Sequence, residues 1–251
     1  MHPPELRDRA IAMHADGVPF RLIWRTLGLP PRTVGNWLYG ERARKRRERQ
    51  PDDRCPRCAD PRRPPDAPAA YAYLLGQYLG DGHIVRARRT VLLAVSCDNR
   101  YPGIIAEVDA AMRSCGARSV HHRAKIGCTA VSALWNHWPC LFPQHGPGHK
   151  HERPIELADW QEPIVGEHAE PFVRGLIHSD GCRFDNRVTV RGRTYSYPRY
   201  MFTNESAHIM DLCRRSLDRL GVEWRMSRRN TLSVAKRASV LRLDGFVGAK
   251  S

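Results

Sequence analysis

The sequence predicts an α+β protein: a tandem pair of pseudo-symmetric helix–strand–strand–helix–strand–strand–helix units, preceded by a small all-α segment. Three observations predict this class. The stretch YLLGQYLGDG at 73–82 returns as FVRGLIHSDG at 172–181, so that Asp180 lies 99 positions after Asp81. Behind both copies, strand-like and helical patterns follow in the same order, which is typical of an internal repeat. Residues 5–38 show helical spacing only.

The N-terminal segment, taken as domain 1–49, has three short helical stretches at 5–15, 20–27 and 31–38. Glycine and proline separate them, and a proline opens the third. This pattern is typical of a helix-turn-helix, whose last helix lies in the DNA major groove. The exposed readers of bases would be Arg32, Thr33 and Asn36, while Val34 and Trp37 would pack inward. A plain three-helix bundle that binds another protein is the alternative.

Positive charge follows this segment and dominates the chain. Lys and Arg number 41 against 26 Asp and Glu, a net charge of +15. This excess favours a polyanionic partner, with double-stranded DNA as the first candidate. A run after the third helix would add salt-sensitive contacts to phosphate; its basic members are Arg42, Arg44, Lys45, Arg46, Arg47 and Arg49.

The same composition excludes a membrane protein. No apolar run approaches the ~20 residues that span a bilayer, and the first residues lack the apolar region of a signal peptide. We therefore expect a cytoplasmic protein, nucleoid-associated if its source is bacterial.

A proline-rich linker is expected at 50–69, and it contains Cys55 and Cys58. Two cysteines at this spacing are half of a tetrahedral zinc site. The missing Zn²⁺ ligands would come from a second chain or from Cys140, His145, His149 and His151. A knuckle without metal is the alternative, and a histidine-rich loop is also typical of phosphate contacts.

The repeats, taken as domains 70–151 and 152–251, open with helices that share a design. Gly76 and Gly80 lie one turn apart, as do Gly175 and Ser179. Small residues at this spacing let two helices cross with their backbones close together. An aspartate is expected in the last turn of each helix, followed by Gly82 or Gly181 as a left-handed cap. Two carboxylates brought together repel each other, and a divalent cation would relieve this repulsion.

These two stretches resemble the paired motifs of LAGLIDADG homing endonucleases. The residues that match are Leu74, Gly76, Asp81 and Gly82 in the first and Gly175, Leu176, Ile177, Asp180 and Gly181 in the second. The resemblance covers about residues 70–248; Gln77, Leu79 and His178 depart from it. It implies motif helices packed at the domain interface and two four-stranded sheets forming a saddle over DNA.

The resemblance also implies a catalytic site. Asp81 and Asp180, with Gly80 and Ser179 beside them, would bind Mg²⁺ or another divalent cation and activate water for double-strand cleavage. Lys125 and Lys236 are expected on comparable late strands of the two units, where they would contact phosphate.

Three functions remain open from the sequence. The first is a Mg²⁺-dependent, site-specific DNA endonuclease with Asp81 and Asp180 as catalytic residues. The second is a non-cleaving transcriptional regulator on the same fold, which the N-terminal segment favours. The third is an RNA maturase, which is disfavoured because a helix-turn-helix does not fit the narrow major groove of RNA. Since one chain carries both repeats, a monomer is expected.

Overall fold

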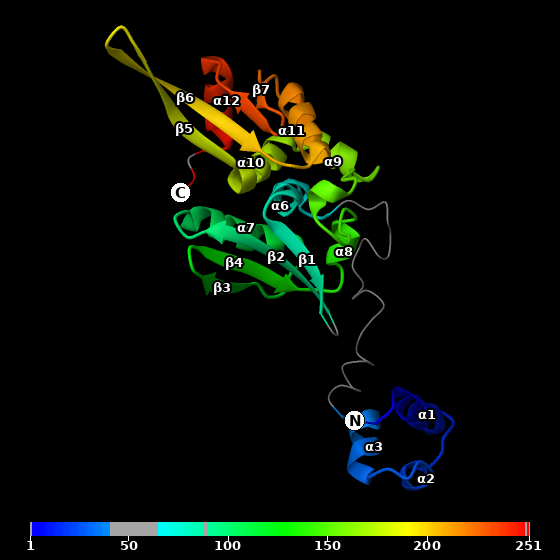
Figure 1. Ribbon diagram of the computed structural model, residues 1–251. Helices are drawn as coiled ribbons and strands as arrows, with labels where there is room; N and C mark the ends of the chain where they lie inside the picture. The colour runs from blue at the N-terminus through cyan, green and yellow to red at the C-terminus, as the bar shows by residue number, and fades with distance from the viewer. Residues whose placement is uncertain (1, 41–64, 88–89, 249, 251) are drawn as a thin grey trace. The chain divides into compact units, whose positions relative to one another are not determined.

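The computed structural model describes residues 2–40, 65–87, 90–248 and 250. The chain forms two compact units, Met1–Cys55 and Pro56–Ser251. The described residues of the first unit form three helices, which lie where the sequence predicts them (Figure 1): α1 (Pro4–Ala15), α2 (Phe20–Thr26) and α3 (Pro31–Leu38). The basic run at 42–49 and the cysteines of the linker lie outside the described residues.

The three helices bury a small apolar core of their own. Its members are Ala10, Ile23, Leu29, Val34 and Leu38. Val34 is fully buried, as predicted, whereas Trp37 is only half-buried and packs on the edge of this core. Arg32 and Asn36 are exposed on α3, and Thr33 is half-buried.

The second unit has the predicted α+β architecture in tandem. The first repeat contains α6 (Pro68–Leu79), β1 (Gly82–Arg86), β2 (Val91–Asp98), α7 (Pro102–Ser114), β3 (His121–Lys125), β4 (Cys128–Leu134) and α8 (Trp138–Leu141). A 3₁₀ turn, η2 (Lys150–Glu152), and α9 (Gln161–Glu167) lead to the second. This repeat contains α10 (Ala169–Asp180), β5 (Gly181–Val190), β6 (Arg193–Thr203), α11 (Ala207–Arg219), β7 (Arg225–Arg228), β8 (Thr231–Val234) and α12 (Arg237–Phe246). The fold class is therefore confirmed.

Each repeat forms one four-stranded antiparallel sheet, and the two sheets have the same topology. Their strand orders are β1-β2-β4-β3 and β5-β6-β8-β7. In the second sheet, β5 and β6 extend as a long two-stranded ribbon (Figure 1). Arg191 and Gly192 close this ribbon with φ angles of 48° and 73°, which is the backbone of a type I′ hairpin turn.

One face of each sheet packs on helices and the other faces outward. Partners across an antiparallel pair lie on the same face, and alternate residues lie on opposite faces. Buried Leu93 and Val95, and buried Tyr200 and Phe202, mark the inner faces. Helix α7 contacts β2 and β4, and α12 contacts β6. The opposite, open faces are covered by none of the described helices of the second unit.

Two elements differ from the sequence pattern. The apolar stretch 134–142, which favours one helix closing the first repeat, forms only the short α8, because Leu134 ends β4 and the Trp135 amide still donates to the Val91 carbonyl at 2.8 Å. Helix α9, absent from the sequence interpretation, precedes the second motif helix. No described helix is both long and apolar enough to cross a bilayer.

Candidate functional site: two carboxylates and two lysines at a helix crossing

The motif helices α6 and α10 cross with their backbones in contact, as the small residues predict. A Cβ atom added at Gly76 would lie 2.5 Å from the Phe172 carbonyl oxygen and 2.8 Å from the Leu176 amide. An added Cβ at Gly175 would meet the Tyr73 carbonyl oxygen. Since these neighbours are backbone atoms, no side-chain rotation could make room.

The close approach continues to the ends of both helices. A Cβ at Gly80 would lie 2.5 Å from the Ser179 Cβ and 3.0 Å from the Asp180 Oδ2. The two motif ends therefore meet, and the crossing carries Asp81 and Asp180 to the same region of the unit.

Gly82 and Gly181 have another role than the one predicted. Neither has a positive φ, and each is the first residue of a strand. Their missing side chains matter because an added Cβ would lie 2.5 Å from the Tyr78 Cα and 2.7 Å from the Ile177 Cα. Likewise, Asp81 is not in the last helical turn, because α6 ends at Leu79 and Gly80 caps it.

The two carboxylates open into different pockets. Asp180 lines one of about 480 Å³ together with Lys150, Asn204 and Glu205. Asp81 lines another of about 430 Å³ together with Lys250, Asp98 and Ser179. The Asn204 side-chain amide donates to the Asp180 Oδ2 at 2.7 Å.

The electrostatics of the carboxylates reflect partial desolvation and mutual repulsion. Asp81 reaches solvent, but the surrounding protein removes part of its hydration and raises its pKa to about 6, with the charge of Asp180 adding to the rise. Desolvation also raises the pKa of Asp180, against the hydrogen bond from Asn204. Lys150 and Lys250 lower both pKa values.

Lys150 caps the end of the first motif helix. Its Nζ donates to the carbonyl oxygens of Leu79 at 3.1 Å, of Gly80 at 2.8 Å and of Tyr78. A cation at this position also favours the negative end of the helix dipole. Burial lowers the pKa of Lys150 to about 8, while Asp180 and then Asp81 act against this decrease.

Lys250 does the same at the second motif helix. Its Nζ donates to the carbonyl oxygens of His178 at 3.0 Å and Gly181 at 2.6 Å. Burial lowers its pKa, and Asp81 is the strongest of the charges that act against this decrease. Each pocket therefore pairs the lysine of one repeat with the aspartate of the other.

Sequence reasoning missed both lysines, although a signal was present. Each follows a glycine by two positions, as Gly148-His-Lys150 and Gly248-Ala-Lys250, and they lie 69 and 70 positions after their motif aspartates. Gly148 and Gly248 have φ angles of 76° and 69°, which favour glycine. This repeated Gly-x-Lys sequence, with a positive φ at the glycine in both copies, is a third element of the internal repeat. Asn204 was missed too.

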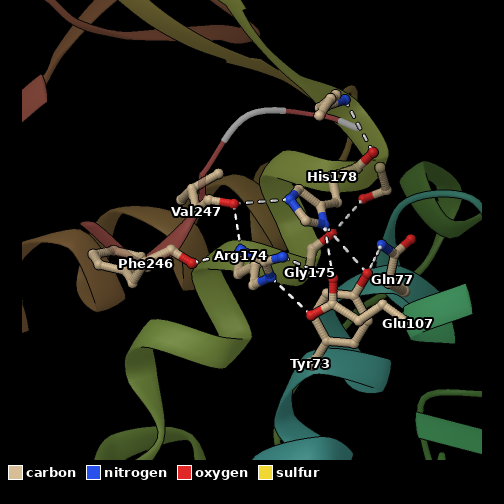
Figure 2. Close-up of polar contacts among 10 residues, drawn as sticks. Tyr73, Gln77, Glu107, Arg174, Gly175, His178, Phe246 and Val247 are labelled. Carbon is tan, nitrogen blue, oxygen red and sulfur yellow. Dashed lines mark hydrogen bonds and ion pairs between the residues drawn. The ribbon is translucent and has the colours of Figure 1, made fainter. Parts of the chain in front are cut away.

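A polar cluster beside the crossing holds the C-terminal end of the chain in place (Figure 2). Arg174 on α10 binds both carboxylate oxygens of Glu107 on α7, at 2.7 and 2.9 Å. It also donates to the carbonyls of Phe246, at 2.7 Å, and Val247. One guanidinium therefore ties the first repeat to the end of the second, just before Lys250.

His178 completes this cluster as a neutral imidazole. Its Nε2 must donate to the Val247 carbonyl at 3.1 Å, because a carbonyl only accepts. Its Nδ1 then accepts from the Tyr73 hydroxyl at 3.2 Å, and that hydroxyl accepts from Gln77 at 2.8 Å. Burial, reinforced by the charge of Arg174, lowers the pKa of His178 to about 4.

We expect the unfolding free energy to depend on pH because the pKa of His178 is lower in the folded than in the unfolded chain. The unfolded histidine has a pKa near 6.5, so acidification favours the unfolded state from about pH 6.5 down to the folded value near 4. Between pH 7.5 and 5, wild type should lose about 2 kcal/mol relative to His178→Gln. Urea unfolding of both proteins measures this difference. The titration of the aspartates contributes equally to both unfolding free energies and therefore cancels. A difference that does not change with pH would contradict a neutral His178.

The arrangement does not fit a divalent cation as it stands. Mg²⁺ takes six oxygen ligands in near-octahedral geometry; several are usually waters, and the protein supplies the others. The Gly80 carbonyl already accepts from Lys150, and the Ser179 hydroxyl donates to its own helix, to the carbonyls of Gly175 and Leu176. Among the described residues, no three His, Cys, Asp or Glu side chains are placed to hold a metal ion.

The remaining predicted residues lie elsewhere. Lys125 is exposed at the end of β3, on the open face of the first sheet. Lys236 is not on a strand: it is the N-cap of α12, and its ammonium pairs with Glu223. His149 and His151 stack with centroids 5.4 Å apart and line the pocket of Asp180. Because Cys55 and Cys58 lie outside the described residues, their zinc site stays a prediction.

Solved structures with a similar fold include LAGLIDADG proteins. Variants of the homing endonuclease I-DmoI are 10% identical, with 73% of this chain and 97% of theirs covered, at a TM-score of 0.45. The meganuclease I-AabMI bound to uncleaved DNA is 11% identical (70% and 82% covered, TM-score 0.46). The N-terminal LAGLIDADG domain of WhiA is 13% identical, with 73% of this chain and 84% of that domain covered, at a TM-score of 0.42.

These likenesses are limited to the arrangement of helices and strands. No family model and no curated protein matches the sequence.

Proposed function

We propose that this protein binds duplex DNA through the open faces of its two sheets. The observation that carries the proposal is a set of cations on the open faces that no acid neutralises. On the inner faces, two cationic strand residues pair with acids of helices, His122 with Asp109 at 2.8 Å and Arg183 with Asp244 at 2.7 Å, while Arg86 and Arg187 make no such pair among the described residues. On the open faces, cations have no such partners among the described residues; they are Arg123, Lys125, Arg193, Arg199, Arg225 and Arg228.

The second sheet shows this most clearly. Arg199 lies beside Tyr197 and Tyr195 on the open face of β6, and Arg225 and Arg228 continue that face on β7. The two tyrosines are about half exposed and stack on each other. No acidic side chain lies on this face among the described strand residues. A basic surface with exposed aromatics is suited to a phosphate backbone.

The open faces begin at the carboxylate site. His83 follows Asp81 by two positions and Cys182 follows Asp180 by two, and both lie on the open faces. DNA bound across the sheets would therefore bring its backbone near the motif aspartates.

We expect Arg225→Ala with Arg228→Ala to weaken binding to a mixed-sequence duplex at least tenfold at 150 mM salt and to reduce the slope of log K against log salt by about 2, because two phosphate contacts are lost. Fluorescence anisotropy over a salt series measures both. The matched control is Arg214→Ala with Arg215→Ala on α11, which pair with Asp211 and remove the same charge. Equal losses in the two double variants would mean that net charge alone controls binding.

We also propose that α3 reads bases in the major groove. Support comes from exposed Arg32 in the first turn of α3, from exposed Asn36 one turn later, and from the buried face that fixes the orientation of the helix. Arg32→Ala should then reduce the preference for a selected sequence more than the affinity for random duplex. Equal loss on all sequences would mean that this helix contacts phosphate only.

DNA cleavage is the second candidate function, favoured by the meeting of Asp81 and Asp180 at the helix crossing. Cleavage of a duplex library in Mg²⁺, lost in both Asp81→Asn and Asp180→Asn, would establish it. Binding without cleavage by wild type would leave the non-cleaving regulator.

A further inference from the structure

Lys150 and Lys250 lie at the positions where a nuclease site built from two carboxylates would bind its metal ions. In each pocket, an aspartate of one repeat lies beside the carbonyl end of the motif helix of the other repeat. Carboxylate and carbonyl oxygens are the ligands of Mg²⁺. Here, these carbonyl oxygens accept hydrogen bonds from Lys150 and Lys250 instead.

We propose that Lys150 and Lys250 are built-in counter-ions that take the place of divalent cations, so that this protein binds DNA without metal and without hydrolysing it. The inference concerns the same site as the proposed function and goes beyond it, since it excludes the metal chemistry that the aspartates by themselves would suggest.

Charge balance supports this assignment. Glu205 and Asp98, which also line the pockets, pair with Arg229 and Arg100. Of the remaining charges, the two aspartates contribute −2 and the two lysines +2, so these four formal charges cancel without any ion. Adding Mg²⁺ would leave a partly buried excess of +2, or would force a lysine out of its carbonyl contacts. Both outcomes are costly, because partly desolvated charge has to be compensated.

The backbone supports it as well. Gly148 and Gly248 turn the chain through positive φ two residues before each lysine, in both repeats. The Lys150 ammonium also lies 5.0 Å from the Tyr78 ring centroid, and that of Lys250 lies 5.8 Å from the Tyr101 ring. Each ammonium group thus follows a glycine of positive φ by two positions and is held by more than one contact.

Direct measurement of metal binding by the full chain, without DNA, tests the proposal. Mn²⁺ is titrated into wild type, into Lys150→Met with Lys250→Met, and into the same double variant carrying Asp81→Asn and Asp180→Asn. We expect wild type to show no site that the aspartates supply. The lysine double variant should gain one, bound at least about tenfold more tightly than any wild-type site, and the added asparagines should remove it.

Thermal unfolding provides a second measurement and checks folding. Mn²⁺ should raise the melting temperature of the lysine double variant and leave wild type unchanged. Lys236→Met is the control, because this lysine is exposed and pairs with Glu223, not with a motif aspartate; its melting temperature, like that of wild type, should not respond to Mn²⁺. If the double variant does not fold, Lys250→Met alone replaces it.

Two results would overturn the proposal. One is Mn²⁺ binding by wild type that Asp81→Asn abolishes, together with Mg²⁺-dependent plasmid nicking that this substitution also abolishes. The other is a folded lysine variant that binds Mn²⁺ no better than wild type. Neither result depends on DNA affinity, so a failure of the proposed DNA binding would be seen separately, in anisotropy.

Discussion

Gly76→Ala should destabilise the second unit by about 2–3 kcal/mol, since overpacking of a close contact typically costs about that much. The added methyl would lie 2.5 Å from the Phe172 carbonyl oxygen and 2.8 Å from the Leu176 amide. Both are backbone atoms of α10, so the two motif helices must move apart. Urea unfolding followed by circular dichroism measures the loss.

Gly245→Ala is the matched control for this substitution. Gly245 also lies in a helix, α12, but an added Cβ there meets no atom within 4 Å. Since alanine favours the helix more than glycine does, stability should stay the same or rise by up to about 1 kcal/mol. Similar losses from both substitutions would show that helix propensity, and not the crossing, explains the effect.

Arg174→Met should lower the unfolding free energy by about 3 kcal/mol, because breaking a partly buried, bidentate ion pair leaves its partners uncompensated. Glu107, about one-third exposed, would lose its cation while facing neutral His178. The carbonyls of Phe246 and Val247 would lose their donor. Urea unfolding gives the size of the loss.

Arg100→Met is the control for Arg174→Met. Arg100 makes an equally bidentate pair with Asp98, but its side chain is 77% exposed, so its removal should not measurably change the urea midpoint. Amide exchange of the C-terminal residues should accelerate in Arg174→Met only. Unchanged exchange there would mean that Arg174 stabilises the protein without anchoring its C-terminal end.

Much of the fold could be predicted from local pattern. The repeat was visible because both units conserve the order of periodicities, and the small residues of α6 and α10 predicted the crossing that the structure shows. Predictions failed where a local sequence pattern is compatible with more than one structural role. Gly82 and Gly181 could serve a left-handed cap or a close approach, and only their neighbours in the folded chain distinguish these roles.

The sequence by itself determined the tandem α+β class, the two motif helices and the pair of aspartates, because periodicity and repetition are properties of the chain alone. Only the tertiary structure decided what surrounds those aspartates. Lys150 and Lys250 reach carbonyl groups some 70 positions earlier in the chain. Such contacts depend on how helices and loops that are distant in the sequence pack together. The spacing of residues along a single helix or strand does not predict that packing. The aspartates suggested a metal site from sequence, and the lysines beside them became visible only in the folded chain.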